Sequence, residues 1–127
     1  MTAPHKDPIA GSSDPRFRGD ASRWNPEELL VAAIAQCHML WYLHLAAEAG
    51  VTVTAYLDVP VGTVEGTPDG VGQFREVVLH PAVTVADPSM VEPALSLHED
   101  VGALCAIARS VAFPVRHQPT ARVAVPG

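Results

Sequence analysis

Two cysteines are the residues of this sequence with the most informative chemistry. Cys37 lies midway along one apolar segment, and Cys105 lies in a second apolar segment near the C-terminus. If each segment is a helix that buries one face, packing of the helices could bring the two thiols together. The pair then predicts either a redox-active dithiol or two buried thiols that act as small hydrophobic side chains. Spacing alone leaves both interpretations open.

The surroundings of Cys37 on its predicted helix are mostly apolar, with Trp41 and His44 on the same face. An apolar environment raises the pKa of a thiol and makes it a poor nucleophile. A reactive cysteine at this position would therefore need a cation from elsewhere in the fold. Arginines just before the helix are candidates, although each could equally belong to a solvated loop: Arg16, Arg18 and Arg23.

Glu27 is a candidate acidic partner in the first turn of the same predicted helix, ten residues before Cys37. Ten residues of helix span about 15 Å, so the carboxylate cannot reach the thiol within its own helix. Its simplest role is to complement the positive end of the helix dipole. If Glu27 and Cys37 belong to one site, that site must join two chains or involve a sharply folded loop.

A structural zinc site is a third interpretation, with Cys37, Cys105 and either His98 or His44 as ligands. The sequence has no CxxC or HxxxH pair of the kind that zinc sites usually contain. It also lacks the P-loop, GxGxxG and GxSxG motifs. We therefore expect no metal and no bound cofactor.

The helix that carries Cys37 has clear start and stop signals. Asn25 is a good N-cap, Pro26 suits the first helical position, and Glu28 completes a capping box. We expect the helix to run to about Ala49, where Gly50 would end it.

Strands are predicted on either side of a turn at residues 67–70. Residues 51–66 and 73–85 alternate in character and are rich in Val and Thr, which favours a hairpin. Pro60 would mark an edge or a bulge. A last strand is expected over roughly residues 116–125.

A second helix is predicted from a cap at Asp87 to about Ala108, with Pro93 producing a kink or a delayed start. Residues 1–24 are proline-rich and predict a loop. Two long core helices and a meander of strands favour an α+β fold on an antiparallel sheet.

The composition is that of one folded domain spanning residues 1–127. Hydrophobic residues make up 48% of the chain and charged residues 17%, which excludes a disordered chain. The net charge of −6 argues against a general nucleic-acid binder. Polar residues interrupt the most apolar stretch, so we expect a core helix and not a membrane span. Without a signal-peptide pattern, we expect a cytoplasmic protein with reduced thiols.

Two motifs stand out when the segments around the two cysteines are considered together. The first motif comprises residues 25–30 (NPEELL), 32–33 and 37–38; the second comprises residues 97–99, 104–105, 107–111 and 113–115. They resemble the motifs of the OsmC-like family, which comprises osmotically inducible protein C and organic hydroperoxide resistance proteins. Together they are far more specific than either cysteine, and the resemblance covers roughly residues 9–118.

The resemblance implies a thiol peroxidase that reduces organic hydroperoxides. It implies that Cys37 is the peroxidatic cysteine, that Cys105 is the resolving cysteine, and that Glu27 is the family's glutamate. The family's arginine occurs in an Arg-Phe-x-Gly context, which would select Arg16 in the run from Arg16 to Gly19. The spacing to Glu27 fits neither Arg16 nor Arg18 cleanly, so we prefer Arg18 and keep Arg16 open. The expected partners are an organic hydroperoxide and an external dithiol reductant, for example of the lipoyl type.

The resemblance also implies an intertwined homodimer with its sites at the interface. Relatives usually carry strands of an N-terminal sheet before this point. We expect either that the true start of the protein lies upstream or that this version lacks that sheet. The alternative function is a catalytically inert dimer, or a module that binds a small apolar ligand in the same groove.

Overall fold

The central element is helix α1, Pro26–Glu48, in a computed structural model that describes residues 1–66, 68 and 70–125. The side chain of Asn25 accepts a hydrogen bond from the backbone N–H of Glu28 at 2.8 Å. The carboxylate of Glu28 accepts the backbone N–H of Asn25 at 3.0 Å. After the helix, Gly50 adopts a φ of +73°, which a residue without a Cβ tolerates best. The predicted start, capping box and stop are confirmed.

The strands form two mixed three-stranded sheets, with the orders β1-β4-β6 and β2-β3-β5. Within each sheet the first pair is antiparallel and the second pair is parallel. The α+β class is confirmed, but the expectation of a wholly antiparallel sheet is wrong. The parallel strands come after the helical crossover that parallel pairing requires. The strands are β1 Val53–Leu57, β2 Val61–Gly66, β3 Gly72–Leu79, β4 Ala82–Val85, β5 Val115–His117 and β6 Thr120–Val123.

Each of the three expected strands is divided between the two sheets. The breaks fall at residues 58–60, 80–81 and 118–119, and each contains a proline: Pro60, Pro81 and Pro119. Proline has no backbone N–H to donate to a strand ladder, so pairing ends there and resumes in the other sheet. The turn predicted at residues 67–70 lies partly outside the described residues, because residues 67 and 69 are not described.

The second helical segment is broken into short pieces, so the expectation of a second long helix is wrong. Pro93 lies in the first turn of its α-helical part, where a missing N–H removes no intrahelical hydrogen bond. The predicted delayed start is therefore confirmed. The pieces are a 3₁₀ turn at Pro88–Met90, α2 Val91–Ser96, a 3₁₀ turn at Leu97–Asp100 and α3 Ala106–Arg109.

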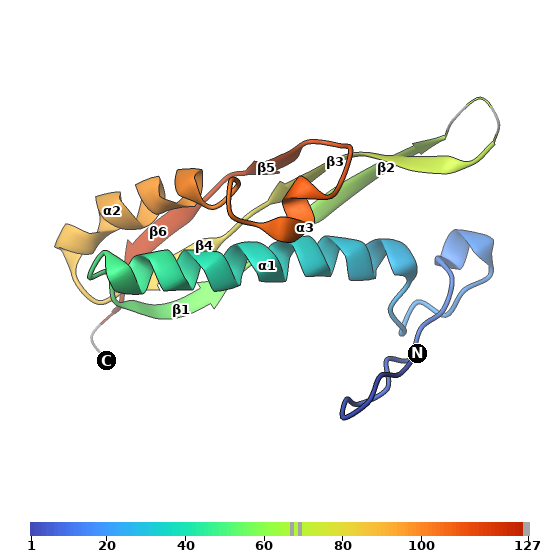
Figure 1. The fold of residues 1–127 in the computed structure, drawn as a ribbon, viewed down its shortest axis with the longest axis horizontal. Coiled ribbons are helices and arrows are strands. Elements are labelled where there is room, and N and C mark those ends of the chain that lie inside the picture. The colour runs from blue at the N-terminus through green and yellow to red at the C-terminus, as the bar shows by residue number, and fades with distance from the viewer. Residues whose placement is uncertain (67, 69, 126–127) are drawn as a thin grey trace.

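Helix α1 runs along the molecule beside the strands of both sheets (Figure 1). Its N-terminal half packs Ile34 against β3, where Leu79 is buried. Its C-terminal half packs Tyr42 in a second buried cluster with Val85 of β4 and Ala94 of α2. Cys37 and His38 lie between these halves. By its length and composition alone, α1 could cross a membrane. Its contacts with the two buried clusters are those of a core helix.

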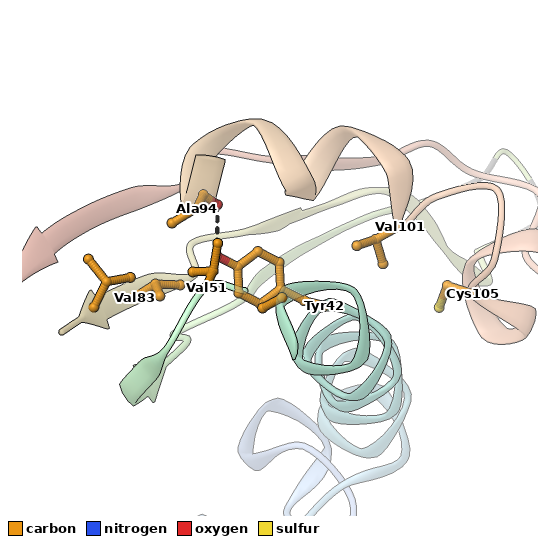
Figure 2. Packing of buried hydrophobic residues seen from close by; sticks show 8 residues of the cluster. Tyr42, Val51, Val83, Ala94, Val101 and Cys105 are labelled. Carbon is orange, nitrogen blue, oxygen red and sulfur yellow. Dashed lines mark hydrogen bonds between the residues drawn. The ribbon is translucent and has the colours of Figure 1, made fainter. Parts of the chain in front are cut away.

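Two tyrosines with buried hydroxyl groups provide a test of the packing between α1 and α2. The Tyr42 hydroxyl donates to the carbonyl oxygen of Ala94 at 2.7 Å (Figure 2). The Tyr56 hydroxyl is buried with no partner in the described part of the chain. We expect Tyr42→Phe to lower the free energy of unfolding by about 1–2 kcal/mol, because it orphans a buried carbonyl. Tyr56→Phe should be neutral or stabilising. Urea unfolding measures both, and equal losses in the two variants would contradict this account.

Candidate functional site

The structure brings the two cysteines together, both as free thiols. Cys37 is half-buried on α1, and Cys105 is 1% exposed at the start of α3, in the buried cluster around Tyr42 (Figure 2). The Cys105 sulfur accepts the backbone N–H of Ala108 at 3.4 Å. Burial, and then a hydrogen bond with Cys37, raise the pKa of the Cys105 thiol. The arrangement places a buried, protonated thiol beside a more accessible one.

Three histidines form a cluster next to Cys105, and two of them are hydrogen-bonded to each other. The Nε2 atom of His38 lies 2.9 Å from Nδ1 of His98. The ring centroids of His38, His98 and His117 lie 5.2, 5.9 and 6.0 Å apart. The ring of Tyr42 stacks on His98 at 4.0 Å. In the described part of the chain, no group of histidine, cysteine and acidic residues could hold a metal ion.

This histidine cluster was missed by the sequence analysis. His38 and His98 both lie inside the two motifs, but spacing did not indicate that they would meet. His117 lies on β5 with no local signal, and its Nε2 atom is 3.2 Å from a carboxylate oxygen of Glu99. Only tertiary packing brings these groups together. They lie on α1, on β5 and on the 3₁₀ turn at Leu97–Asp100, which is the second 3₁₀ turn of the segment after β4.

Burial keeps two of the imidazoles neutral. It lowers the pKa of His38 to about 4, and repulsion from His117 adds to the effect. It lowers the pKa of His98 to about 3, with further repulsion from His38 and His117. The Nε2 atom of His98 is buried with no partner among the described residues. Both rings therefore act as neutral hydrogen-bonding groups near pH 7.

A small cavity of about 40 Å³ joins the buried thiol to this cluster. Cys105, His38 and His117 supply its polar wall, and Ile34, Leu79 and Val115 line the rest together with the helical backbone around Gly102. A space of this size and polarity is sufficient for a water molecule.

A separate groove of about 850 Å³ lies at the N-terminal end of α1. Its charged wall includes Glu27, Arg16 and Arg23, while Val31 and Phe74 supply apolar surface. Cys37 does not line it. The structure therefore does not bring Glu27 to Cys37 within one chain, in agreement with the separation of about 15 Å expected along the helix.

The loop before α1 orients Arg16 and Arg18 differently. Arg16 pairs with Asp14 at 3.0 Å, and Asp14, then Glu27 more weakly, raises the pKa of Arg16. Arg18 adopts a φ of +66° and does not line the groove. The turn is tight, because a Cβ at Gly19 would overlap the carbonyl oxygen of Ser13. The role of either arginine at a thiolate stays a prediction.

The fold and the site together are those of an α+β protein in which a pair of cysteines lies beside a central helix. The model of the OsmC-like protein family matches residues 19–119. The chain therefore belongs to the OsmC-like family, as its motifs predicted.

Solved structures agree with this assignment. An OsmC-like protein of unknown function from Vibrio cholerae is 30% identical, with a TM-score of 0.79 over 87% of this chain and 76% of that chain. An organic hydroperoxide resistance protein OsmC from Legionella pneumophila is 19% identical, with a TM-score of 0.66 over 90% and 79%. An organic hydroperoxide resistance protein from Elizabethkingia anophelis is 17% identical, with a TM-score of 0.65 over 88% and 76%. The last two show the fold alone. No curated protein matches the chain.

The neutral histidines predict a loss of stability in acid. The folded-state pKa values of His38 and His98 lie below the usual value of 6.5. At pH values between the folded-state pKa values and 6.5, the unfolded chain binds protons that the folded chain does not bind. The free energy of unfolding therefore rises with pH in this range. The free energy of unfolding should therefore fall as the pH drops from 6.5 towards 4.

The variant His98→Gln should reduce the slope of the free energy of unfolding against pH. The reduction should correspond to at most one bound proton. The exposed histidine variant His44→Gln, measured by the same urea titrations between pH 4 and 7, should keep the parent slope. An unchanged slope in His98→Gln would show that His98 is protonated in the folded state.

Proposed function

We propose that this protein is a thiol-dependent peroxidase that reduces organic hydroperoxides to alcohols. One observation carries the proposal: a half-buried thiol at Cys37 hydrogen-bonds with a buried thiol at Cys105, which is the arrangement that a sulfenic acid and a resolving thiol require. The names of the two organic hydroperoxide resistance proteins with this fold support the same chemistry.

In the first step, Cys37 as a thiolate attacks the distal oxygen of the hydroperoxide. The O–O bond breaks, Cys37 becomes a sulfenic acid, and the alkoxide takes a proton and leaves as the alcohol. A nearby guanidinium would stabilise the negative charge that develops. Arg16 shares the groove with Glu27 and Arg18 does not, which favours Arg16 for this role. Glu27 would then orient the guanidinium through an ion pair.

In the second step, Cys105 attacks the Cys37 sulfur. The new S–S bond replaces the S–O bond, and the hydroxyl group leaves as water. An external dithiol, for example of the lipoyl type, then reduces the disulfide by thiol–disulfide exchange. A reducing cytoplasm would supply such a dithiol.

The site is proposed to be completed by a second copy of the chain. The apolar residues of helix α1 are spread around its circumference, and the fold leaves Leu40 58% exposed and Trp41 37% exposed. A helix of this kind is stable in water when its remaining face is also covered. In a homodimer that covers this face, the groove of one copy, with Glu27 and Arg16, would meet the thiol of the other copy.

Apolar side chains support an organic substrate. Leu40 and Trp41 on α1 would line the approach to Cys37 in the dimer, and Phe113, which packs against Phe74 at 5.2 Å between ring centroids, would extend the same surface. Such a lining favours alkyl and lipid hydroperoxides over hydrogen peroxide.

The peroxidase proposal predicts consumption of cumene hydroperoxide by the purified protein with dihydrolipoamide as reductant. Turnover should disappear in Cys37→Ser, because the attacking sulfur is lost, and should be strongly reduced in Cys105→Ser. Cumene hydroperoxide should react faster than hydrogen peroxide.

Absence of turnover in the parent protein would overturn this proposal. It would favour the inert dimer or a module that binds a small apolar ligand, for which the groove of about 850 Å³ offers space. Equal rates for the two peroxides would contradict the proposed substrate class.

The shared site predicts complementation between two defective variants. Cys37→Ser and Glu27→Gln should each be nearly inactive as homodimers. Co-refolded in equal amounts, they form mixed dimers with one intact site, so about a quarter of parent activity should return. Activity no greater than the sum of the separate variants would show that Glu27 and Cys37 do not act across the interface.

A further inference from the structure

The proton of the buried Cys105 thiol needs an acceptor when the disulfide closes. We propose that His117, paired with Glu99, takes this proton through the small cavity beside Cys105. This inference rests on the proposed function, because it assigns the base for the second step of that reaction.

The need for a base follows from the burial of Cys105. The residue is 1% exposed, so bulk hydroxide has little access to its thiol. Burial also raises the pKa of this thiol, which keeps it protonated near neutral pH. Because only the thiolate attacks sulfur, resolution would be slow without a proton acceptor inside the protein.

The cavity of about 40 Å³ supplies the route. Cys105, His38 and His117 all line it, and one water molecule held by these groups would relay a proton between them. Strand β3 contributes the apolar Leu79 to the cavity wall. The titratable groups packed around it are Cys37, His38 and Tyr42 from α1, His98 and Glu99 from the second 3₁₀ turn, Cys105 from the start of α3, and His117 from β5.

Two of the three histidines are poorly suited as the base. His98 does not line the cavity, and its Nδ1 atom is bonded to His38. His38 is 5% exposed and has its Nε2 atom in that same hydrogen bond. A positive charge on either ring would be buried without a carboxylate partner, which burial strongly disfavours.

His117 has the features that a base needs. Its Nε2 atom lies 3.2 Å from a carboxylate oxygen of Glu99, so Nε2 carries the proton and Nδ1 keeps its lone pair. No described residue occupies Nδ1. The carboxylate would stabilise the imidazolium, and the His117 side chain is 24% exposed, so the charge is partly solvated.

The proton balance closes with the same group acting twice. The Cys105 thiol gives its proton to Nδ1 of His117, and the sulfur attacks the Cys37 sulfenic acid. As the S–O bond breaks, His117 returns the proton to the departing hydroxide, which leaves as water. The products are the disulfide, one water molecule and a neutral imidazole.

A chromogenic disulfide separates this step from peroxide chemistry. With 5,5′-dithiobis(2-nitrobenzoate), Cys37 forms a mixed disulfide and releases one thionitrobenzoate. Cys105 then attacks that mixed disulfide, its proton goes to His117, and a second thionitrobenzoate leaves. Stopped-flow absorbance resolves the two phases, and neither phase uses a hydroperoxide.

We expect His117→Gln to leave the first phase unchanged and to slow the second by about 10- to 100-fold. The second phase should also become steeply pH-dependent, rising about tenfold per pH unit as the thiolate fraction grows. Glu99→Gln, at a side chain that is 77% exposed, should show a smaller slowing in the same direction without disturbing the core.

His44→Gln is the matched control, because His44 also pairs with a carboxylate, Glu48 at 3.3 Å, but lies outside the cavity. Parent-like rates and pH profiles in the second phase of both His117→Gln and Glu99→Gln would overturn the inference. Equal slowing in His44→Gln, or release of only one thionitrobenzoate by the parent, would also overturn it. A slow second phase in His117→Gln supports the inference even if the parent protein does not consume cumene hydroperoxide. Failure of the inference and failure of the peroxidase proposal are therefore distinguishable.

Discussion

Burial of one face of α1 across both sheets is the constraint on which the rest of the structure depends. Val31, Ile34, His38, Tyr42 and Ala46 are the buried residues of the helix, and they follow one another at intervals of three or four. Four of them are suited to a core. The fifth, His38, brings an imidazole into the apolar interior, where a polar group without a partner is costly. The structure meets this cost with a hydrogen bond to His98.

That hydrogen bond ties the polar cluster to the dithiol. His98 lies in the second 3₁₀ turn, and Cys105 follows it where the chain turns back into the core at Val101. Because the segment is broken here and does not continue as one helix, Cys105 faces Cys37 and the cavity that it shares with His117. The packing that stabilises the core is therefore also the packing that would serve the proposed redox chemistry.

The long central helix and the strand-forming segments could be predicted well from local signals. The capping box of Asn25 and Glu28 and the positive φ of Gly50 act within a few residues, so they could be recognised before any packing was known. Strand directions and the division into two sheets could not be predicted, although a proline stands at every break. Proline excludes a ladder hydrogen bond at its own position, but it does not say which sheet the chain joins next.

By itself, the sequence determined α1, the strand-forming segments, the two cysteines and the motifs that define the family, because these depend on neighbours in the chain. The tertiary structure alone decided that Cys37 contacts Cys105, that His38, His98 and His117 gather beside them, and that Glu27 lies in a different groove. These outcomes depend on contacts between residues up to about 80 positions apart. Such contacts are set by how α1 is buried against both sheets, and no periodicity along the chain records them.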